Sequence, residues 1–406
     1  MTRKPDYPTR LIREGSTEVL VPQLEAFQKK PFEYAPSKAP VFYNPVMELN
    51  RDIAVIALQA YQTMLQREIS VCEPLAGCGI RGIRYAKEVK GVKNVVMGDI
   101  NEKAVQLAKC NVQKSRLSHK IHVKHENAGF LLSSYSAPHM RFDVVDIDPF
   151  GSPAPYLDSA VCALRDGGLM ALTATDMAPL CGVHPAACLR KYGGKPLRAE
   201  YCHELAVRLL AGCLAVTAAR HDMSITVLFS HSIAHYARLY AICEYGAKKA
   251  DESLKNLGFV LHCFRCFHRE TTKKPLLEHL GRCGECSSKL DFAGPLWLGK
   301  IMNSGFCALM EAEAQKKQFK LGGKIDRLLA LARAEADAPA LYYVIDKLCG
   351  ALGLPVPPVR DVAETLEFHG YNAYFTGFNS RGIRTDAPVM KVKEILRLLK
   401  MPDGKF

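Results

Sequence analysis

The chain has 406 residues, of which 48% are hydrophobic and 23% charged, so it is long enough to bury more than one core. Its formal net charge of +13 favours an acidic partner such as nucleic acid, although a merely basic enzyme can carry the same charge. No apolar leader and no run of about 18 apolar residues occurs, so we expect a cytoplasmic protein without membrane contact. No obligate protein partner is evident from the sequence. Its 15 cysteines are then expected to be thiols or metal ligands.

Residues 1–50 are rich in proline and predict an extended lead-in with few regular elements. A helix is expected over 51–66, and strands and helices alternate after it. The expected strands are 69–73, 94–98, 121–124, 142–147, 168–173 and 225–229, and the expected helices are 80–88, 102–115, 155–164 and 199–220. Repeated units of this kind predict an α/β fold, with a parallel sheet covered on both faces.

The pattern changes after about residue 231. Residues 235–245 alternate like a strand, 247–256 predict a helix and 259–263 a further strand, and a cysteine cluster and a helix-rich, Lys/Arg-rich part follow. We therefore predict one domain over residues 1–231, with its N-terminal extension, and a smaller α+β domain over residues 232–406.

A glycine-rich turn joins the first predicted strand to its helix. In 73-EPLAGCGIRGIRYA-86, Gly77, Gly79 and Gly82 fit G-x-G-x-x-G, which lets the backbone approach a nucleoside closely. Asp99 ends the next strand, 22 residues after Gly77, where a carboxylate can accept both hydroxyl protons of an adenosine ribose. This arrangement suits NAD and S-adenosylmethionine equally.

The stretch 146-DIDPFGSP-153 follows the fourth strand, at the sheet edge where ligands bind in open α/β folds. The Asp148 carboxylate can accept hydrogen bonds from an exocyclic amine on a base and take up the proton that the amine loses. Pro149 shapes the turn, and Phe150 supplies a flat face for an extruded base. A plain β-turn would explain the residue types but not their position in the sheet.

Two further groups are candidate ligand contacts. In 125-HENAGF-130, Asn127 and the Ala128 backbone follow the third strand, where an adenine would lie. Near the start of the first helix, Arg51 can hold a carboxylate bidentately, although a solvated arginine fits the sequence equally well.

Basic residues at both ends of the chain are candidates for RNA binding. The stretch 371-YNAYFTGFNSRGIRTDAP-388 interleaves aromatic residues with Arg381 and Arg384, a mixture that is typical of nucleic-acid contacts. Arg13, before Gly15, can extend the same basic surface. The alternatives are an ordinary aromatic cluster at a loop-rich edge and a solvated arginine.

Four cysteines carry the most specific spacing in the chain. Cys263, Cys266, Cys283 and Cys286 form C-x₂-C-x₁₆-C-x₂-C, which is typical of two thiolate knuckles that hold one tetrahedral Zn²⁺. Four thiolates leave no open coordination position, so this zinc is expected to be structural.

The order FYNPVMELNRD, EPLAGCGIRGIRYA, GDIN, ENA, DIDPFGSPAPYLDSA resembles the tRNA (guanine-26-N2)-dimethyltransferases, and LCGVHP and GIRTDAP extend the resemblance over nearly the whole chain. It implies a Rossmann-like class I methyltransferase domain that uses S-adenosylmethionine to modify N2 of guanine 26 in tRNA. Carried over residue by residue, it implies cofactor contacts from Arg51, Arg81, Asp99, Asn127 and Ala128. Asp148 would be catalytic, with Phe150 at the target base.

Three alternatives stay open at this point. An amino-methyltransferase acting on another RNA or on DNA adenine would differ in its target base. An NAD-dependent oxidoreductase would keep the glycines and Asp99, but it needs a hydride-site His, Lys or Tyr that we do not find. A zinc-ribbon RNA-binding protein with an inactive catalytic domain would shift tRNA without binding the methyl donor.

Overall fold

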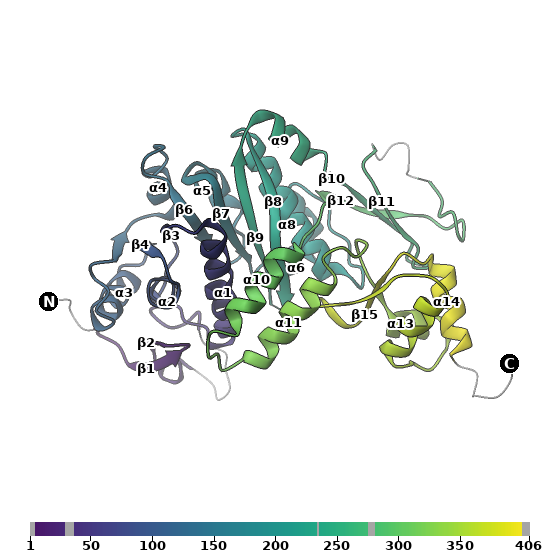
Figure 1. The fold of residues 1–406 in the computed structure, drawn as a ribbon, viewed down its shortest axis with the longest axis horizontal. Helices are drawn as coiled ribbons and strands as arrows, with labels where there is room; N and C mark the ends of the chain where they lie inside the picture. The colour runs from purple at the N-terminus through teal and green to yellow at the C-terminus, as the bar shows by residue number, and fades with distance from the viewer. Residues whose placement is uncertain (1–4, 29–35, 234, 275–280, 400–406) are drawn as a thin grey trace.

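The computed structural model describes residues 5–28, 36–233, 235–274 and 281–399 (Figure 1). Its centre is a seven-stranded sheet with the order β5-β4-β3-β6-β7-β9-β8. The strands are β3 (Ile69–Glu73), β4 (Val92–Asp99), β5 (Ile121–His125), β6 (Phe142–Ile147), β7 (Leu164–Ala174), β8 (Met223–Ile233) and β9 (Tyr236–Tyr245). Strands β3 to β7 are parallel, and β9 runs antiparallel to both of its neighbours.

Helices cover the sheet in two groups, as the alternation in the sequence predicts. The first group is α1 (Glu48–Leu65), α2 (Ile80–Glu88) and α3 (Glu102–Lys114); the second is α4 (Ala128–Ser133), α5 (Leu157–Cys162) and α8 (Cys202–Ala219). All six residues of β6 are buried, as expected for a central parallel strand with helices on both faces. By length and composition α8 could cross a membrane, but 72% of it is buried inside the protein.

The sheet corrects the predicted domain boundary. β9 begins after residue 231 and pairs with both β7 and β8, so a boundary at that point would cut a hairpin of the central sheet. The short helices α6 (Met177–Leu180) and α7 (Pro185–Tyr192) lie between β7 and α8, and α9 (Ala247–Leu254) follows β9. The central sheet therefore continues to Tyr245.

The proline-rich lead-in contains a hairpin that the sequence did not predict. Strands β1 (Thr9–Glu14) and β2 (Thr17–Pro22) are antiparallel, with Glu14 opposite Thr17, and Gly15 in the turn has φ of 53°. Val19 and Val21 alternate into the core. An ion-pair network then ties the hairpin to the sheet's helices: Glu14 pairs with Arg51 at 2.6 Å.

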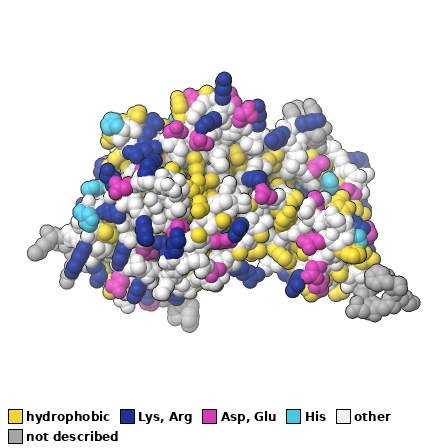
Figure 2. Space-filling model, viewed as in Figure 1, with side chains coloured by type: hydrophobic (Ala, Val, Ile, Leu, Met, Phe, Trp, Pro, Cys, Tyr) yellow, Lys and Arg dark blue, Asp and Glu magenta, His cyan; other side chains and the backbone are white. Residues whose placement is uncertain are grey.

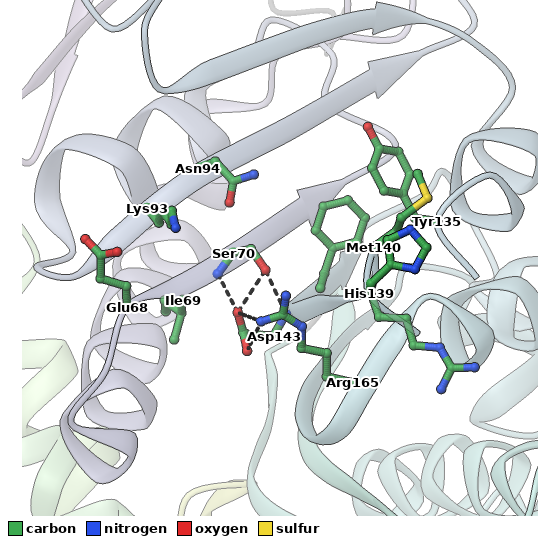
Figure 3. A pocket seen from close by; sticks show the side chains of 12 residues that line it. Glu68, Ile69, Ser70, Lys93, Asn94, Tyr135, His139, Met140, Asp143 and Arg165 are labelled. Atoms are coloured by element: carbon green, nitrogen blue, oxygen red, sulfur yellow. Dashed lines mark hydrogen bonds and ion pairs between the residues drawn. The ribbon is translucent and has the colours of Figure 1, made fainter. Parts of the chain in front are cut away.

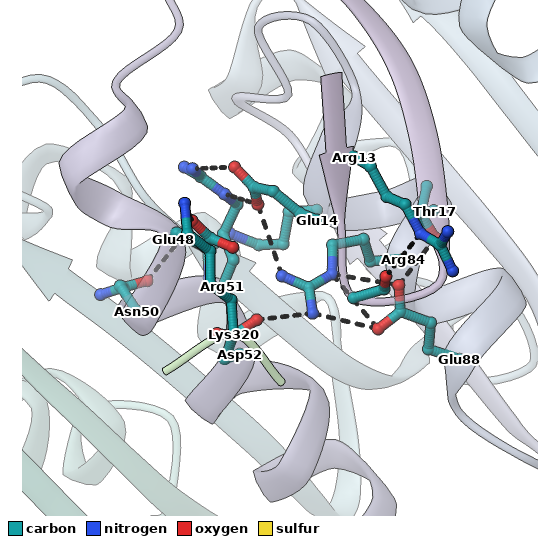
Figure 4. Close-up of polar contacts among 12 residues, drawn as sticks. Arg13, Glu14, Thr17, Glu48, Asn50, Arg51, Asp52, Arg84, Glu88 and Lys320 are labelled. Carbon is teal, nitrogen blue, oxygen red and sulfur yellow. Dashed lines mark hydrogen bonds and ion pairs between the residues drawn. The ribbon is translucent and has the colours of Figure 1, made fainter. Parts of the chain in front are cut away.

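Figure 4 shows how this network continues through a second buried arginine. The Arg84 guanidinium lies 3.4 Å from Glu14, 2.7 Å from Asp52 and 3.0 Å from Glu88. These three partners come from β1, α1 and α2, so the network fixes the hairpin against both helices.

The C-terminal part contains two three-stranded sheets (Figure 1). One has the order β11-β10-β12, from β10 (Leu257–His262), β11 (Arg269–Thr272) and β12 (Asp291–Trp297). The other has the order β13-β15-β14, from β13 (Tyr343–Val344), β14 (Ala373–Thr376) and β15 (Asn379–Thr385). The helices among the described residues after β12 are α10 (Ser304–Ala314), α11 (Gly322–Ala334), α12 (Ile345–Leu352), α13 (Val359–Phe368) and α14 (Val389–Leu398).

The hydrophobic cores do not follow a simple two-domain division. One core runs continuously from Val19 to Val344, because α10 packs on α1 and β12 packs on α8. A second core involves β13, β15 and helices α12 to α14, and a small third core surrounds the four clustered cysteines. The sheet and the first half of the C-terminal part thus share one interior.

Candidate active site

The glycine turn between β3 and α2 has the geometry of a nucleoside cradle. Gly77 and Gly79 have φ of 54° and 79°, in the left-handed region that favours glycine. A Cβ at Gly82 would lie 2.4 Å from Met97 Sδ and 2.8 Å from Glu73 Oε2, so glycine lets α2 approach β3 and β4 closely. The turn therefore presents backbone rather than side chains to a ligand at the carboxyl edge of the sheet.

Asp99 lies beside this cradle at the end of β4. Its Oδ2 accepts a hydrogen bond from the Gly77 amide at 2.8 Å, and its Oδ1 accepts one from the Asn101 amide at 2.8 Å. A carboxylate oxygen can accept more than one hydrogen bond, so both oxygens keep capacity for ribose hydroxyls. The two amides fix the orientation that such a contact requires.

Asn127 and Ala128 follow β5, the neighbouring strand, as predicted. Asn127 is exposed and caps α4 through a hydrogen bond from the Gly129 amide to its Oδ1, at 2.9 Å. Ala128 is buried. Because β4 and β5 are parallel neighbours, Asp99 and these two residues lie along one edge of the sheet.

Arg81 and Asp148 meet next to the cradle. Arg81, on α2, donates from Nη2 both to a carboxylate oxygen of Asp148 and, at 2.8 Å, to Asn50 Oδ1. The guanidinium is buried, whereas the Asp148 side chain is 19% exposed and so remains reachable from solvent. Arg81, predicted to contact the cofactor, thus contacts the predicted catalytic residue directly.

Further buried ionisable side chains lie next to Arg81. Asp146 accepts a bidentate contact from Arg238, at 2.8 and 2.7 Å, and lies 3.7 Å from Arg81. Burial alone would raise the pKa of Asp146, but Arg238 and Arg81 hold it below its usual value. Burial raises the pKa of Glu73, also 3.7 Å from Arg81, well above its usual value. Arg238 lies on β9, beyond the predicted boundary, and sequence reasoning missed it.

Phe150 projects from the loop after β6 and is 71% exposed. Its ring stands nearly perpendicular to that of Phe42, at 84°, with the centroids 4.3 Å apart. The loop is held by Thr175, whose hydroxyl accepts from the Gly151 amide at 2.7 Å and whose amide donates to the Gly151 carbonyl at 2.9 Å. Pro149 is buried at its base. Phe150 therefore offers an exposed aromatic surface two residues after Asp148, with Phe42 packed against it, and the sequence indicated only Phe150.

Arg51 does hold a carboxylate, but it is the protein's own. Its Nε and Nη2 donate to Glu14 at 2.7 and 2.6 Å, and Nη2 also donates to the Asn44 carbonyl at 3.0 Å. A ligand carboxylate would have to share this guanidinium with Glu14. The partner comes from the unpredicted hairpin, so nothing in the local sequence indicated it.

The four predicted metal ligands are brought together. The sulfur atoms of Cys263, Cys266, Cys283 and Cys286 lie within 4.8 Å of one another. The closest pairs are Cys263 with Cys286 and Cys266 with Cys283, both at 3.5 Å. Four thiols at such separations can close around one tetrahedral ion with only small movements.

The two cysteine turns repeat the same backbone geometry. In the first, the Phe267 amide donates to the Cys263 carbonyl at 2.8 Å; in the second, the Ser287 amide donates to the Cys283 carbonyl at 2.8 Å. Phe267 and Ser287 both have positive φ, 66° and 56°. This matched pair of tight turns fits a zinc ion as well as the spacing does.

The predicted RNA-binding arginines differ in their surroundings. Arg13 is exposed on β1. Arg381 is partly exposed and pairs with Asp346 at 2.7 Å. Arg384 is buried and pairs with Glu204 at 2.9 Å and Glu335 at 2.5 Å, so the prediction that it contacts RNA is wrong. Two carboxylates and the core hold its side chain.

A cavity of about 310 Å³ lies at the opposite edge of the sheet, near the amino ends of β3 and β6. Figure 3 shows Asp143 at its floor, where it accepts hydrogen bonds from Ser70 and Arg165. Because the glycine turn and Asp148 follow the carboxyl ends of the strands, this cavity is separate from the candidate active site.

The sheet, with one reversed strand between β7 and β8, and the site at its carboxyl edge define a Rossmann-like methyltransferase. A model of the family described as N2,N2-dimethylguanosine tRNA methyltransferase matches residues 15–397. The chain therefore belongs to this family.

Individual relatives are similar to this chain over nearly its full length. The chain is 44% identical to the tRNA (guanine(26)-N(2))-dimethyltransferase of Methanothermobacter thermautotrophicus, over 97% of this chain and 99% of that one. It is 34% identical to the tRNA (guanine(26)-N(2)/guanine(27)-N(2))-dimethyltransferase of Aquifex aeolicus, over 95% and 96%. The structure of Trm1 from Pyrococcus horikoshii with S-adenosyl-L-methionine superimposes with a TM-score of 0.83, at 32% identity, over 95% of this chain and 99% of that one.

Proposed function

We propose that this protein transfers methyl groups from S-adenosylmethionine to the exocyclic N2 amine of guanine 26 in tRNA, giving N2-methyl- and N2,N2-dimethylguanosine. Membership of the family and full-length similarity to relatives of that name support the substrate and the reaction. The observation that carries the proposal is the position of Asp148, which is partly exposed after the carboxyl end of β6, pairs with Arg81 of the helix that follows the glycine turn, and precedes exposed Phe150 by two residues.

The residues present fit the methyl donor. Positive φ at Gly77 and Gly79 opens the cradle, and the Asp99 carboxylate, oriented by two amides, would receive the ribose hydroxyls. Asn127 and the Ala128 backbone would border the adenine. When bound, S-adenosylmethionine supplies an electrophilic methyl group on its sulfonium.

The chain's own residues would then position the base and handle its proton. The Asp148 carboxylate would accept hydrogen bonds from the guanine N2 amine and take the proton that this amine loses. Phe150 and Phe42 would hold the base in place through their ring faces. Arg81 would keep the Asp148 carboxylate oriented, because its Nη2 is anchored to Asn50.

We further propose that the part of the chain after Tyr245 contacts the tRNA and that the four clustered cysteines bind structural zinc. Next to the cysteines, Arg265, Arg282 and Lys289 line a cavity of about 590 Å³ that is suited to phosphate groups. Figure 2 shows Lys and Arg side chains spread along one face of the molecule rather than gathered in one patch. Such a distribution suits a long polyanion, and we expect the enzyme to act in the cytoplasm.

A transfer assay with labelled S-adenosylmethionine tests this function. We expect label in unmodified tRNA transcripts with guanine 26, little in transcripts with adenine at that position, and none in ribosomal RNA or DNA. Asp148→Ala should lose about 10²- to 10⁴-fold in rate, the contribution of a positioned general base, and still bind tRNA. Equal labelling of the adenine-26 transcript, or a wild-type rate for Asp148→Ala, would contradict the proposal.

A further inference from the structure

A second group of metal-ligating side chains lies outside the four-cysteine cluster. The sulfur atoms of Cys181 and Cys202 and one ring nitrogen of His203 lie within 4.8 Å of one another, and all three residues are half-buried. Cys181 follows α6, whereas Cys202 and His203 begin α8, the helix beside it (Figure 1). We propose that these three side chains form a second metal site, for a thiophilic divalent cation such as Zn²⁺, with one coordination position open.

The backbone brings the two cysteines together at a position that requires glycine. Gly182 has φ of 85°, and a Cβ there would lie 2.7 Å from the amide nitrogen of Arg198 and 2.8 Å from the carbonyl carbon of Leu197. The turn after α6 therefore lies directly against the segment that leads into α8. This contact sets Cys181 beside Cys202, although 20 residues separate them in the chain.

Hydrogen bonds fix which nitrogen of His203 can bind a metal. The Ser232 hydroxyl donates to the Tyr236 carbonyl at 3.0 Å, so its oxygen accepts from His203 Nδ1, also at 3.0 Å. Nδ1 then carries the proton, and Nε2 keeps its lone pair. A metal-bound histidine is held in this way, with its other nitrogen donating to an oxygen that orients the ring.

The thiols complete a soft ligand set. Cys202 is the first residue of α8, where the partial positive charge of the helix N-terminus favours a thiolate. Two sulfurs and one imidazole select zinc-like ions over Mg²⁺ or Ca²⁺, which prefer oxygen ligands. Three protein ligands leave room for a water molecule, unlike the four-thiolate cluster.

The site has a clear structural consequence for the active site. Thr175, which holds the loop of Phe150, leads directly into α6, and Asp176 accepts from Tyr192 of α7. A metal bound by Cys181, Cys202 and His203 would cross-link this segment to α8. The inference does not depend on the proposed methyl transfer, since metal content is measured without activity.

Metal content of the purified full-length protein tests the proposal. After loading with Zn²⁺ and removal of loosely bound ions, Cys202→Ser and His203→Gln should each retain one equivalent of zinc fewer than the wild type. Cys213→Ser, a cysteine on the same helix outside both clusters, should retain the wild-type amount. Cys263→Ser should lose the other equivalent.

Cobalt gives a second readout. Co²⁺ bound to the Cys263→Ser protein should show thiolate charge-transfer absorption that disappears when Cys202→Ser is added. Equal zinc content in the wild type, Cys202→Ser and His203→Gln would overturn the proposal. An intact mass lower by two hydrogens without reductant, restored in Cys181→Ser, would also overturn it in favour of a disulfide.

Discussion

Arg81 and Asp148 form an ion pair that joins the first helix after the glycine turn to the loop after β6. The same Arg81 nitrogen that contacts Asp148 also contacts Asn50 of α1, so three elements determine where the carboxylate points. The proposed cradle for the methyl donor and the proposed acceptor for the amine proton are therefore held together by one set of contacts.

Arg81→Lys should lower kcat about 10²-fold, because a single ammonium cannot keep both contacts and small displacements of reacting groups are costly. Steady-state kinetics with tRNA checks this. The matched control is Arg165→Lys, which changes an arginine paired with Asp143 at the other edge of the sheet and should leave kcat unchanged. A wild-type kcat for Arg81→Lys would show that Arg81 does not position Asp148.

Phe150→Ala should lower kcat/KM about 10- to 100-fold, since stacking on an aromatic ring is worth about 1–3 kcal/mol per base. Its stability should change little, because the ring is 71% exposed. Phe368→Ala is the control, as that ring at the end of α13 is 87% exposed and far from the loop in the chain. Equal kcat/KM values for the two variants would show that Phe150 does not contact the target base.

Arg384→Ala should destabilise the protein by about 3–5 kcal/mol, because it removes the buried cation that pairs with both Glu204 and Glu335. Glu204 keeps Arg208 as a partner, and Glu335 keeps the hydrogen bond from the Gly377 amide. Arg381→Ala should cost at most about 1 kcal/mol, because Arg381 is partly exposed and pairs with Asp346 at the surface. Urea unfolding measures both. The affinity for tRNA should fall for Arg381→Ala. An equal loss of stability in both variants would contradict the contrast between buried Arg384 and surface-paired Arg381.

Stability should fall as the pH is lowered from 7 to 5. Burial lowers the pKa of both His231 and His262 to about 3, with Arg238 and Arg269 adding to the effect. The unfolded chain therefore binds protons between about pH 6.5 and 3 that the folded protein does not, so each residue costs about 2 kcal/mol at pH 5. Urea unfolding at pH 7 and pH 5 measures this loss of stability. The loss should be about 2 kcal/mol smaller for His231→Gln than for the wild type, and unchanged for the exposed control His119→Gln. Identical pH dependence in the wild type and both variants would contradict the prediction.

The sequence predicted most of the sheet because its strands are apolar runs between turn residues. The bounds of β3, α2 and β6 agree with the prediction, since each has a sharp hydrophobic pattern. Asp148 and the four cysteines could be singled out because each signal lies in one local motif, and the four sulfurs do lie within 4.8 Å of one another. The catalytic and metal-binding roles of these residues stay predictions.

What the sequence missed depends on contacts between distant segments. Glu14 is the partner of Arg51 across 37 residues, and Arg384 is buried against Glu204 across 180. A charged residue is expected at the surface when the sequence does not show which distant residue pairs with it. The domain boundary was predicted near residue 231 because the alternation of strands and helices changes there, whereas β9 lies beyond that point and pairs with β7 and β8.

The most direct test of the central claim is nucleoside analysis of a tRNA transcript after reaction with the purified enzyme and S-adenosylmethionine. We predict that the wild-type enzyme forms N2-methyl- and N2,N2-dimethylguanosine at position 26 and that Asp148→Ala forms neither product. Methylation of another atom or another base, or the same products from Asp148→Ala, would contradict it.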